Sequence, residues 1–280
     1  MALMPESFVN QATGRCSVEG AKFWFNCNPD SPSHWFKVEW LDKVKEKNLV
    51  HLHFVMDDNP SLSEAVKNRY KSLYAGVFFK RFILGLWVMA EGAIFDMFDE
   101  AENIFDHDLP EYILENSNHY IAIDYGTQNA TVFLHIVDSG DTVWVYREYY
   151  YSGRNTGVQK TDSEYAKDLI KFGGEHPIRS VVIDPSAASF IAEVKKTTPF
   201  RVKEADNDVL AGIRLTSTCI ARRICKVHQQ CTNLIREIQS YVWDPNPTEK
   251  GNEKPKKKDD HGPDALRYWF KTIFKPRRLG

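Results

Sequence analysis

Three aspartates stand at positions where a carboxylate can take part in catalysis. Asp124 ends the short apolar run 121–123, Asp184 ends a second apolar run, and Asp264 lies three residues after His261 near the start of a helical pattern. Carboxylates that lie close together repel one another and tend to take up protons unless a cation binds between them. Oxygen ligands of this kind favour Mg²⁺ or Mn²⁺. The pattern therefore predicts a site for two divalent ions, about 4 Å apart, that activate water and stabilise a leaving oxygen in phosphodiester cleavage.

Each of these residues also has an ordinary structural explanation. An aspartate after a strand is usually a turn former, and a histidine among acids is usually a solvated surface residue. His261 fits either a metal ligand, which would favour Mn²⁺, or a proton carrier. Asp260 is a neighbouring acid that could replace or join Asp264, and Glu148 could face the site if its strand is turned that way.

A basic run lies directly before the last of these acids. A charge run is most often a solvated loop. Because this one enters the predicted metal site, sequence-independent contacts with a phosphate backbone are a second interpretation. The predicted DNA-binding residues are Lys254, Lys256, Lys257 and Lys258.

The second half of the chain has the element order of an RNase H-like α/β domain. Short connections between the first apolar runs predict three antiparallel strands, followed by alternating helices and strands. Strands are expected near 120–124, 130–137, 142–151, 179–183, 200–203 and 224–227, and helices over 162–172, 187–195, 209–222, 232–241 and 263–274. In such a sheet ligands gather at strand ends near a topological switch, so Asp124 and Asp184 are expected side by side.

The first part of the chain is harder to interpret. Strands are expected over 22–26 and 51–55 and helices over 33–47 and 63–73, without a complete sheet. The sequence has no G-x-x-x-x-G-K-[ST] phosphate loop, which excludes a self-sufficient P-loop ATPase. A boundary is expected between about residues 87 and 118, and the predicted domains are 1–100 and 101–280.

The composition limits the possible classes of protein. The net charge of −2 gives no global basic signature, so nucleic-acid binding would depend on local patches. Five cysteines without a C-x-x-C pair indicate reduced thiols. The sequence shows no signal peptide and no apolar run near the roughly 20 residues that span a bilayer. These features predict a soluble intracellular protein.

These segments together resemble the large terminase subunit of tailed double-stranded DNA phages. The resemblance covers nearly the whole chain, and its most specific part is the segment that opens the last helix. Segments 5–8, 15–17 and 23–29 resemble the end of the packaging ATPase domain, segments 85–87 and 92–95 its joint to the nuclease domain, and segments 122–126, 182–185 and 260–268 the three nuclease motifs.

The resemblance carries several expectations. It implies a metal-dependent endonuclease that cuts concatemeric double-stranded DNA during packaging, with Asp124, Asp184, Asp264 and His261 at the metals. It also implies a portal protein and a small terminase subunit as partners, the host cytoplasm as location, and no membrane. Segment 26–28 would be a remnant of the motif that couples ATP hydrolysis to movement, through Asn26 and Asn28. Because the Walker motifs are absent from this sequence, no ATPase activity is expected from this chain alone.

Two other functions remain open at this point. A non-catalytic piece that docks to the portal would keep the fold without cutting DNA. Residues 124–127 also resemble the first phosphate loop of an actin-like or sugar-kinase fold. That fold needs a second, glycine-containing loop, and Pro185 stands where its glycine would be.

Overall fold

The chain divides into two compact units. In this computed structural model the described residues are 4, 6–15, 17–32, 34–126, 129–245 and 253–279. The first unit comprises residues 1–92 and 243–255, and the second comprises residues 93–242 and 256–280. Each unit is described separately.

The named elements in the described part of the first unit are helices and 3₁₀ turns. Its helices are α1 (Glu6–Gly14), α2 (Trp35–Glu39), α3 (Glu64–Lys71) and α4 (Gly76–Phe82), with the 3₁₀ turns η1 (Leu41–Lys43) and η2 (Met56–Asp58). The buried guanidinium of Arg81 in α4 pairs with Asp30 at 3.0 Å and with Glu253 at 2.6 Å. The second ion pair ties the late segment 243–255 to the rest of this unit.

Three sequence-based expectations for this unit are wrong. Residues 22–26 and 51–55 belong to no strand, and Trp24 and Phe54 are 87% and 72% exposed. A strand needs a hydrogen-bonded neighbour, and apolar residues alone do not supply one. The helix expected over 33–47 is divided into α2 and η1, because Trp40 between them leaves the helical conformation at φ −121°.

The second unit is built on a mixed sheet of seven strands in the order β1-β7-β4-β3-β2-β5-β6, and the expected α/β fold with a mixed sheet is confirmed. Strands β2, β3 and β4 are antiparallel, and β5 is parallel to β2. The strands are β1 (Ile104–Phe105), β2 (Asn118–Asp124), β3 (Ala130–Asp138), β4 (Val143–Ser152), β5 (Ile178–Ile183), β6 (Val202–Glu204) and β7 (Cys225–His228).

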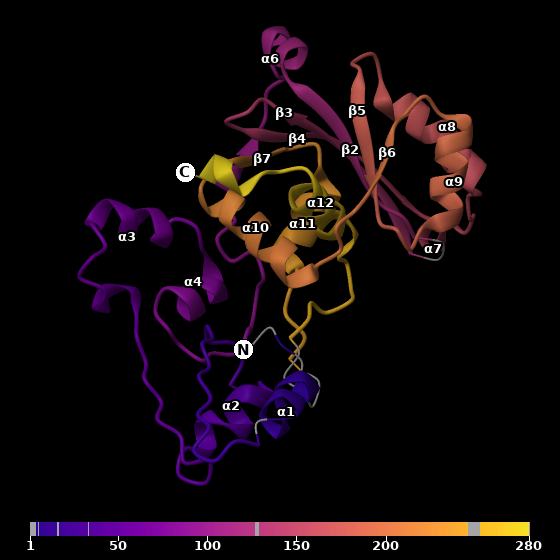
Figure 1. Ribbon diagram of the computed structural model, residues 1–280. Helices are drawn as coiled ribbons and strands as arrows, with labels where there is room; N and C mark the ends of the chain where they lie inside the picture. The colour runs from indigo at the N-terminus through magenta and orange to yellow at the C-terminus, as the bar shows by residue number, and fades with distance from the viewer. Residues whose placement is uncertain are drawn as a thin grey trace. The chain divides into compact units, whose positions relative to one another are not determined.

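Helices cover both faces of this sheet (Figure 1). Helices α8 and α9 lie on one face, and α10 and α12 pack on the other, with α11 beside α12. The helices are α5 (Glu100–Asn103), α6 (Glu111–Asn116), α7 (Gly153–Thr156), α8 (Asp162–Gly173), α9 (Ala188–Thr197), α10 (Val209–Ala221), α11 (Thr232–Ser240) and α12 (His261–Thr272), followed by the 3₁₀ turn η3 (Pro276–Leu279). Among the described residues, no helix has the length and apolar character needed to cross a membrane.

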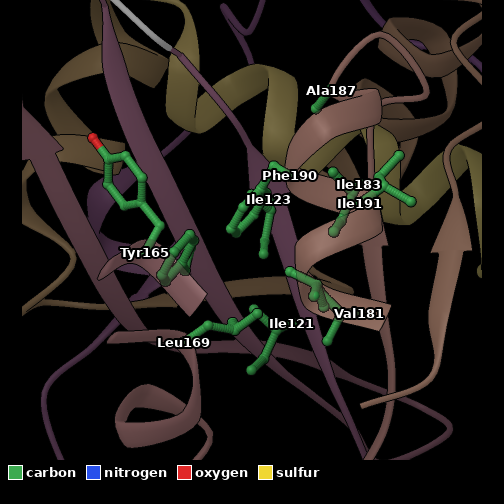
Figure 2. Packing of buried hydrophobic residues seen from close by; sticks show 11 residues of the cluster. Ile121, Ile123, Tyr165, Leu169, Val181, Ile183, Ala187, Phe190 and Ile191 are labelled. Atoms are coloured by element: carbon green, nitrogen blue, oxygen red, sulfur yellow. The ribbon is translucent and has the colours of Figure 1, made fainter. Parts of the chain in front are cut away.

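The alternation of side chains along β2 decides which face receives the catalytic candidate. Ile121 and Ile123 point into the apolar core under α8 and α9, where Figure 2 shows Ile123 beside Phe190 and Ile121 near Leu169. Tyr120 lies on the opposite face, with its ring centroid 5.7 Å from that of Trp269 in α12. Because side chains alternate along a strand, Asp124 falls on the face that carries α12.

A chain of buried histidines joins β2, β3 and β4 within this unit. The Leu114 carbonyl can only accept, so His119 donates to it from Nε2 at 2.7 Å. His119 Nδ1 then accepts from His135 Nε2 at 2.9 Å, and His135 Nδ1 accepts from Arg147 at 3.0 Å. His176 stacks on His119 with the ring centroids 4.8 Å apart. This direction of donation requires both buried imidazoles to be neutral.

Candidate metal-dependent nuclease site

The two strand-end aspartates lie at the same edge of the sheet. Asp124 is the last residue of β2, and Asp184 directly follows β5. The preceding residues, Ile123 and Ile183, are register partners in the parallel pair. Parallel strands present their carboxyl ends at one edge of a sheet. Asp124 and Asp184, each the next residue after one of these partners, therefore lie at the same edge.

The start of α12 brings further acids to this edge. Asp260 is the N-cap residue and His261 begins the helix, two residues earlier than expected from the sequence. His261 Nδ1 lies 2.9 Å from Asp124 Oδ2, and the Tyr268 hydroxyl donates to Asp124 Oδ1 at 3.4 Å. The structure therefore brings together Asp124 and His261, which are separated by more than a hundred residues in the sequence.

The pKa values of Asp124 and His261 are both raised. Burial raises the pKa of Asp124 to about 6, and the neighbouring carboxylates add to this, while its hydrogen bond with His261 acts in the opposite direction. Burial works against the charged imidazolium of His261, but the bond to Asp124 and the nearby acids outweigh it and raise the pKa of His261. Both pKa values are therefore raised, and the charged form of His261 is stabilised by the acids around it.

Asp184 is held by neutral donors. Its Oδ1 accepts from the Ser186 backbone N–H at 2.7 Å, and its Oδ2 accepts from Asn207 Nδ2 at 2.6 Å. Burial alone would raise the pKa of Asp184, but hydrogen bonds with Ser186 and Tyr268, together with the charge of Arg267, lower it. Asp184 is consequently a carboxylate in its charged form over the neutral pH range.

Asp264 is surrounded by donors from several elements. Its Oδ1 is 3.1 Å from the Arg267 guanidinium and accepts from the Tyr241 hydroxyl at 3.2 Å. Its Oδ2 accepts from Lys257 Nζ at 2.9 Å. Arg267 also donates to Asn207 Oδ1 at 3.0 Å. Through Asn207 this buried cation connects the carboxylates of Asp264 and Asp184.

Asp260 differs from Asp264 in its hydrogen bonding. Its side chain is buried, and Lys257 Nζ lies 3.1 Å from Oδ2. The geometry of this ion pair makes no hydrogen bond, so the buried Oδ2 has no hydrogen-bond donor. Among the residues that the structure describes, no group of three or more His, Cys, Asp and Glu side chains is arranged to hold a metal ion.

The predicted DNA-binding lysines are exposed but differ in direction. Lys254 lies 3.9 Å from Asp244, and Lys258 lies 4.0 Å from Asp259. Lys256 is exposed. Lys257 turns toward the acids of α12. From the sequence all four lysines were expected to contact DNA in the same way. In the structure Lys257 differs from the others, because its ammonium contacts Asp260 and Asp264.

Two acids near the site have structural positions that the sequence did not decide. Glu148 accepts from the backbone N–H groups of Asn233 and Leu234, at 2.8 and 2.9 Å, and thereby caps α11. The fully buried Glu237 accepts from the Gly262 N–H at 2.7 Å. Glu237 was not identified from the sequence, where it is one glutamate in an amphipathic helix. Nothing there indicates that it meets a backbone N–H 25 residues away.

Asn26 and Asn28 are exposed residues of the first unit, outside any strand or helix. Their assignment to a coupling motif stays a prediction. The likewise predicted division into an ATPase remnant and a nuclease domain also stays a prediction.

Comparisons with known proteins identify the family. The large terminase of the thermophilic bacteriophage D6E, solved with ADP, is 51% identical, with a TM-score of 0.89 over 97% of this chain and 67% of that one. The terminase large subunit of Escherichia phage T5 is 23% identical over 251 residues, which are 86% of this chain and 56% of the relative. The nuclease domain of the phage P22 large terminase, at 17% identity, a TM-score of 0.51 and coverage of 67% of this chain and 97% of that domain, shows a shared fold. No protein-family model matches the chain.

The fold and the 51% identity over 97% of the chain place it among the large phage terminases. The chain belongs to the large terminase family, and the sugar-kinase interpretation is set aside. It spans about two thirds of the D6E protein and 56% of the T5 protein.

Proposed function

We propose that this chain is a metal-dependent endonuclease that cuts concatemeric double-stranded phage DNA during packaging. The observation that supports this most directly is that acids from the ends of β2 and β5 and from the start of α12 lie at one edge of the sheet, and that several of them contact positive groups. Asp124 meets His261 at 2.9 Å, and the Lys257 ammonium lies within 3.1 Å of both Asp260 and Asp264. These acids already bind positively charged side chains of the protein, so the same place suits a metal cation.

The donor set fits Mg²⁺ or Mn²⁺. Asp260 Oδ2 is a buried carboxylate oxygen whose positive neighbour is the Lys257 ammonium at 3.1 Å. A buried carboxylate needs such a charge, and a divalent ion could take the place of the ammonium. In the proposal Asp124, Asp184 and Asp264 hold two ions with His261 beside them, and Asp260 joins them. Bound ions would supply a water of lowered pKa and neutralise charge on the leaving oxygen.

The chain's own residues have separate parts in this proposal. His261, which lies 2.9 Å from Asp124, would take up the proton released from the attacking water. Arg267 and Asn207 keep two carboxylates at a fixed spacing. Lys254, Lys256 and Lys258, together with Lys257 once it is released from the acids, guide the DNA backbone without reading sequence.

The proposal extends to partners in the packaging machine. A portal protein and a small terminase subunit are proposed partners, and the host cytoplasm is the proposed location.

Incubation with supercoiled plasmid tests the proposal. The chain should nick and linearise the DNA in Mn²⁺ or Mg²⁺ and leave it intact in EDTA. Asp184→Ala should abolish cutting, whereas Asp141→Ala, which changes an exposed aspartate in the turn between β3 and β4, should cut like the parent. A parent chain that never cuts, together with an Asp184→Ala variant that still binds portal protein, would refute the nuclease and support an assembly role.

A further inference from the structure

Lys257 combines an exposed side chain with an ammonium bound to acids. The side chain is 69% exposed, yet Nζ lies 2.9 Å from Asp264 Oδ2 and 3.1 Å from Asp260 Oδ2. Its neighbour Lys258 has a similar exposure of 72% and approaches an acid only at 4.0 Å, where it meets Asp259. Exposed lysines usually gain little from a fixed ion pair. The backbone around Lys257 must therefore direct its side chain toward the two acids.

The backbone around Lys257 explains this position. The Lys256 N–H donates to the Val242 carbonyl at 2.9 Å, and the Lys258 N–H donates back to the Lys256 carbonyl at 2.9 Å. Lys257 is thus the middle residue of a three-residue turn. Asp259 then adopts the left-handed conformation at φ +51°, which aspartate tolerates better than most residues, and Asp260 caps α12. The tight turn returns the Lys257 side chain to the start of the helix.

A divalent ion and the ammonium cannot share these oxygens. Asp264 Oδ1 is already engaged by Arg267 and Tyr241, so Lys257 lies on its remaining oxygen. Lys257 also lies on the oxygen of Asp260 that has no hydrogen-bond donor. A metal ion bound to either oxygen would stand within a few ångströms of a like charge, which is unfavourable in a partly buried site. The long flexible stem of lysine allows the ammonium to leave.

We propose that Lys257 is a built-in counter-ion that competes with the divalent cation for Asp260 and Asp264, and so weakens metal binding. This inference rests on the proposed metal site. Without metal the ammonium relieves repulsion among the carboxylates. When metal binds, the ammonium moves out to the solvent-exposed side that its stem already occupies.

Calorimetric titration of the full chain with MnCl₂ tests the inference. Lys257→Met should bind Mn²⁺ about three- to tenfold more tightly than the parent, because the competing ion pair, partly screened by solvent, is gone. Lys258→Met is the matched control, since it removes one positive charge from the next position and should change the affinity much less. Lys257→Gln repeats the test with a polar side chain of similar length and shows whether the loss of charge alone is sufficient.

Thermal unfolding gives a second readout that is independent of cleavage. In EDTA the Lys257→Met variant should melt below the parent, because its carboxylates are less well neutralised, and Mn²⁺ should raise its Tm by more than it raises that of the parent. Unchanged or weaker Mn²⁺ binding by both Lys257 variants, while the parent binds Mn²⁺, would overturn the inference. If neither the parent nor any variant binds Mn²⁺, the proposed metal site itself is wrong.

Discussion

Glu237 offers a sharp test of how the site is positioned. Its side chain is fully buried, its Oε2 accepts from the Gly262 N–H at 2.7 Å, and its Oε1 accepts from the Tyr150 hydroxyl at 2.7 Å. Burial raises the pKa of Glu237, although these hydrogen bonds act against the rise. Gly262 follows His261 in the first turn of α12. Glu237 is therefore expected to be a positioning residue that fixes the start of the helix carrying His261.

The magnitude follows from the two donors. Glu237→Ala leaves the buried Gly262 N–H without an acceptor and removes the hydrogen bond of the half-buried Tyr150 hydroxyl. At about 1 to 3 kcal/mol for the first and about 1 kcal/mol for the second, the free energy of unfolding should fall by about 2 to 4 kcal/mol. Glu237→Gln can keep both contacts. Its amide oxygen accepts from Gly262 while its NH₂ donates to the Tyr150 oxygen. This variant loses only the carboxylate charge beside the helix N-terminus, worth about 0.3 to 1 kcal/mol.

Denaturant unfolding and metal-dependent plasmid cleavage measure the two effects. At a temperature where both variants are folded, Glu237→Ala should cut slowly and Glu237→Gln close to the parental rate. The acidic limb of the pH–rate profile should move toward lower pH in Glu237→Gln, because a negative group near the His261 imidazolium is gone. Equal stability of Glu237→Ala and Glu237→Gln, or an Ala variant that cuts as fast as the parent, would refute the reasoning.

Two further predictions concern the buried histidines and the acids of α12. Burial, with the charge of Arg147, lowers the pKa of His135 to about 3, so folding favours its neutral form. The resulting stability is complete above the unfolded pKa of about 6.5 and is lost as pH falls, by about 1 kcal/mol between pH 7 and pH 5.5. Denaturation at both pH values should show a smaller loss for His135→Asn than for the parent, and equal losses would contradict this. Asp264→Ala should lower the free energy of unfolding by about 3 to 5 kcal/mol because the buried Arg267 loses its carboxylate. Asp260→Ala, which removes an oxygen without a hydrogen-bond donor, should stay within about 1 kcal/mol of the parent and lose Mn²⁺ binding. A similar destabilisation in both variants would show that these acids have the same role.

The sequence predicted the sheet edge well because the signals there are local. A short apolar run that ends in an aspartate predicts both the strand and the position of Asp124 at its end. The strand order then places Asp184 beside it. The same kind of signal failed over 22–26 and 51–55, since an apolar run states that a strand is possible and not that a partner strand is present.

The contacts that tune the site could not be predicted in this way. Glu237 meets Gly262, and Asn207 meets Asp184, through hydrogen bonds between residues more than 20 positions apart. No local pattern in the sequence marks either pair. Lys257 is a different case, because its run was recognised but its direction depends on a three-residue turn. Charge composition identified the lysines, and backbone geometry singled out one of them.

Arg267 and Lys257, the two cations that contact Asp264, differ in burial and in the number of groups that hold them. The Arg267 guanidinium is 1% exposed, keeps its proton at any ordinary pH, and is bonded to Asp264 and through Asn207 to Asp184. Its charge therefore stays in place whether or not an ion binds, and it fixes the spacing of two carboxylates. Lys257 is held by two carboxylates alone and has an exposed stem. In the proposed metal site one charge is fixed and the other can leave. We therefore expect the geometry of the site to depend on Arg267, and the concentration of metal needed to fill it to depend on Lys257.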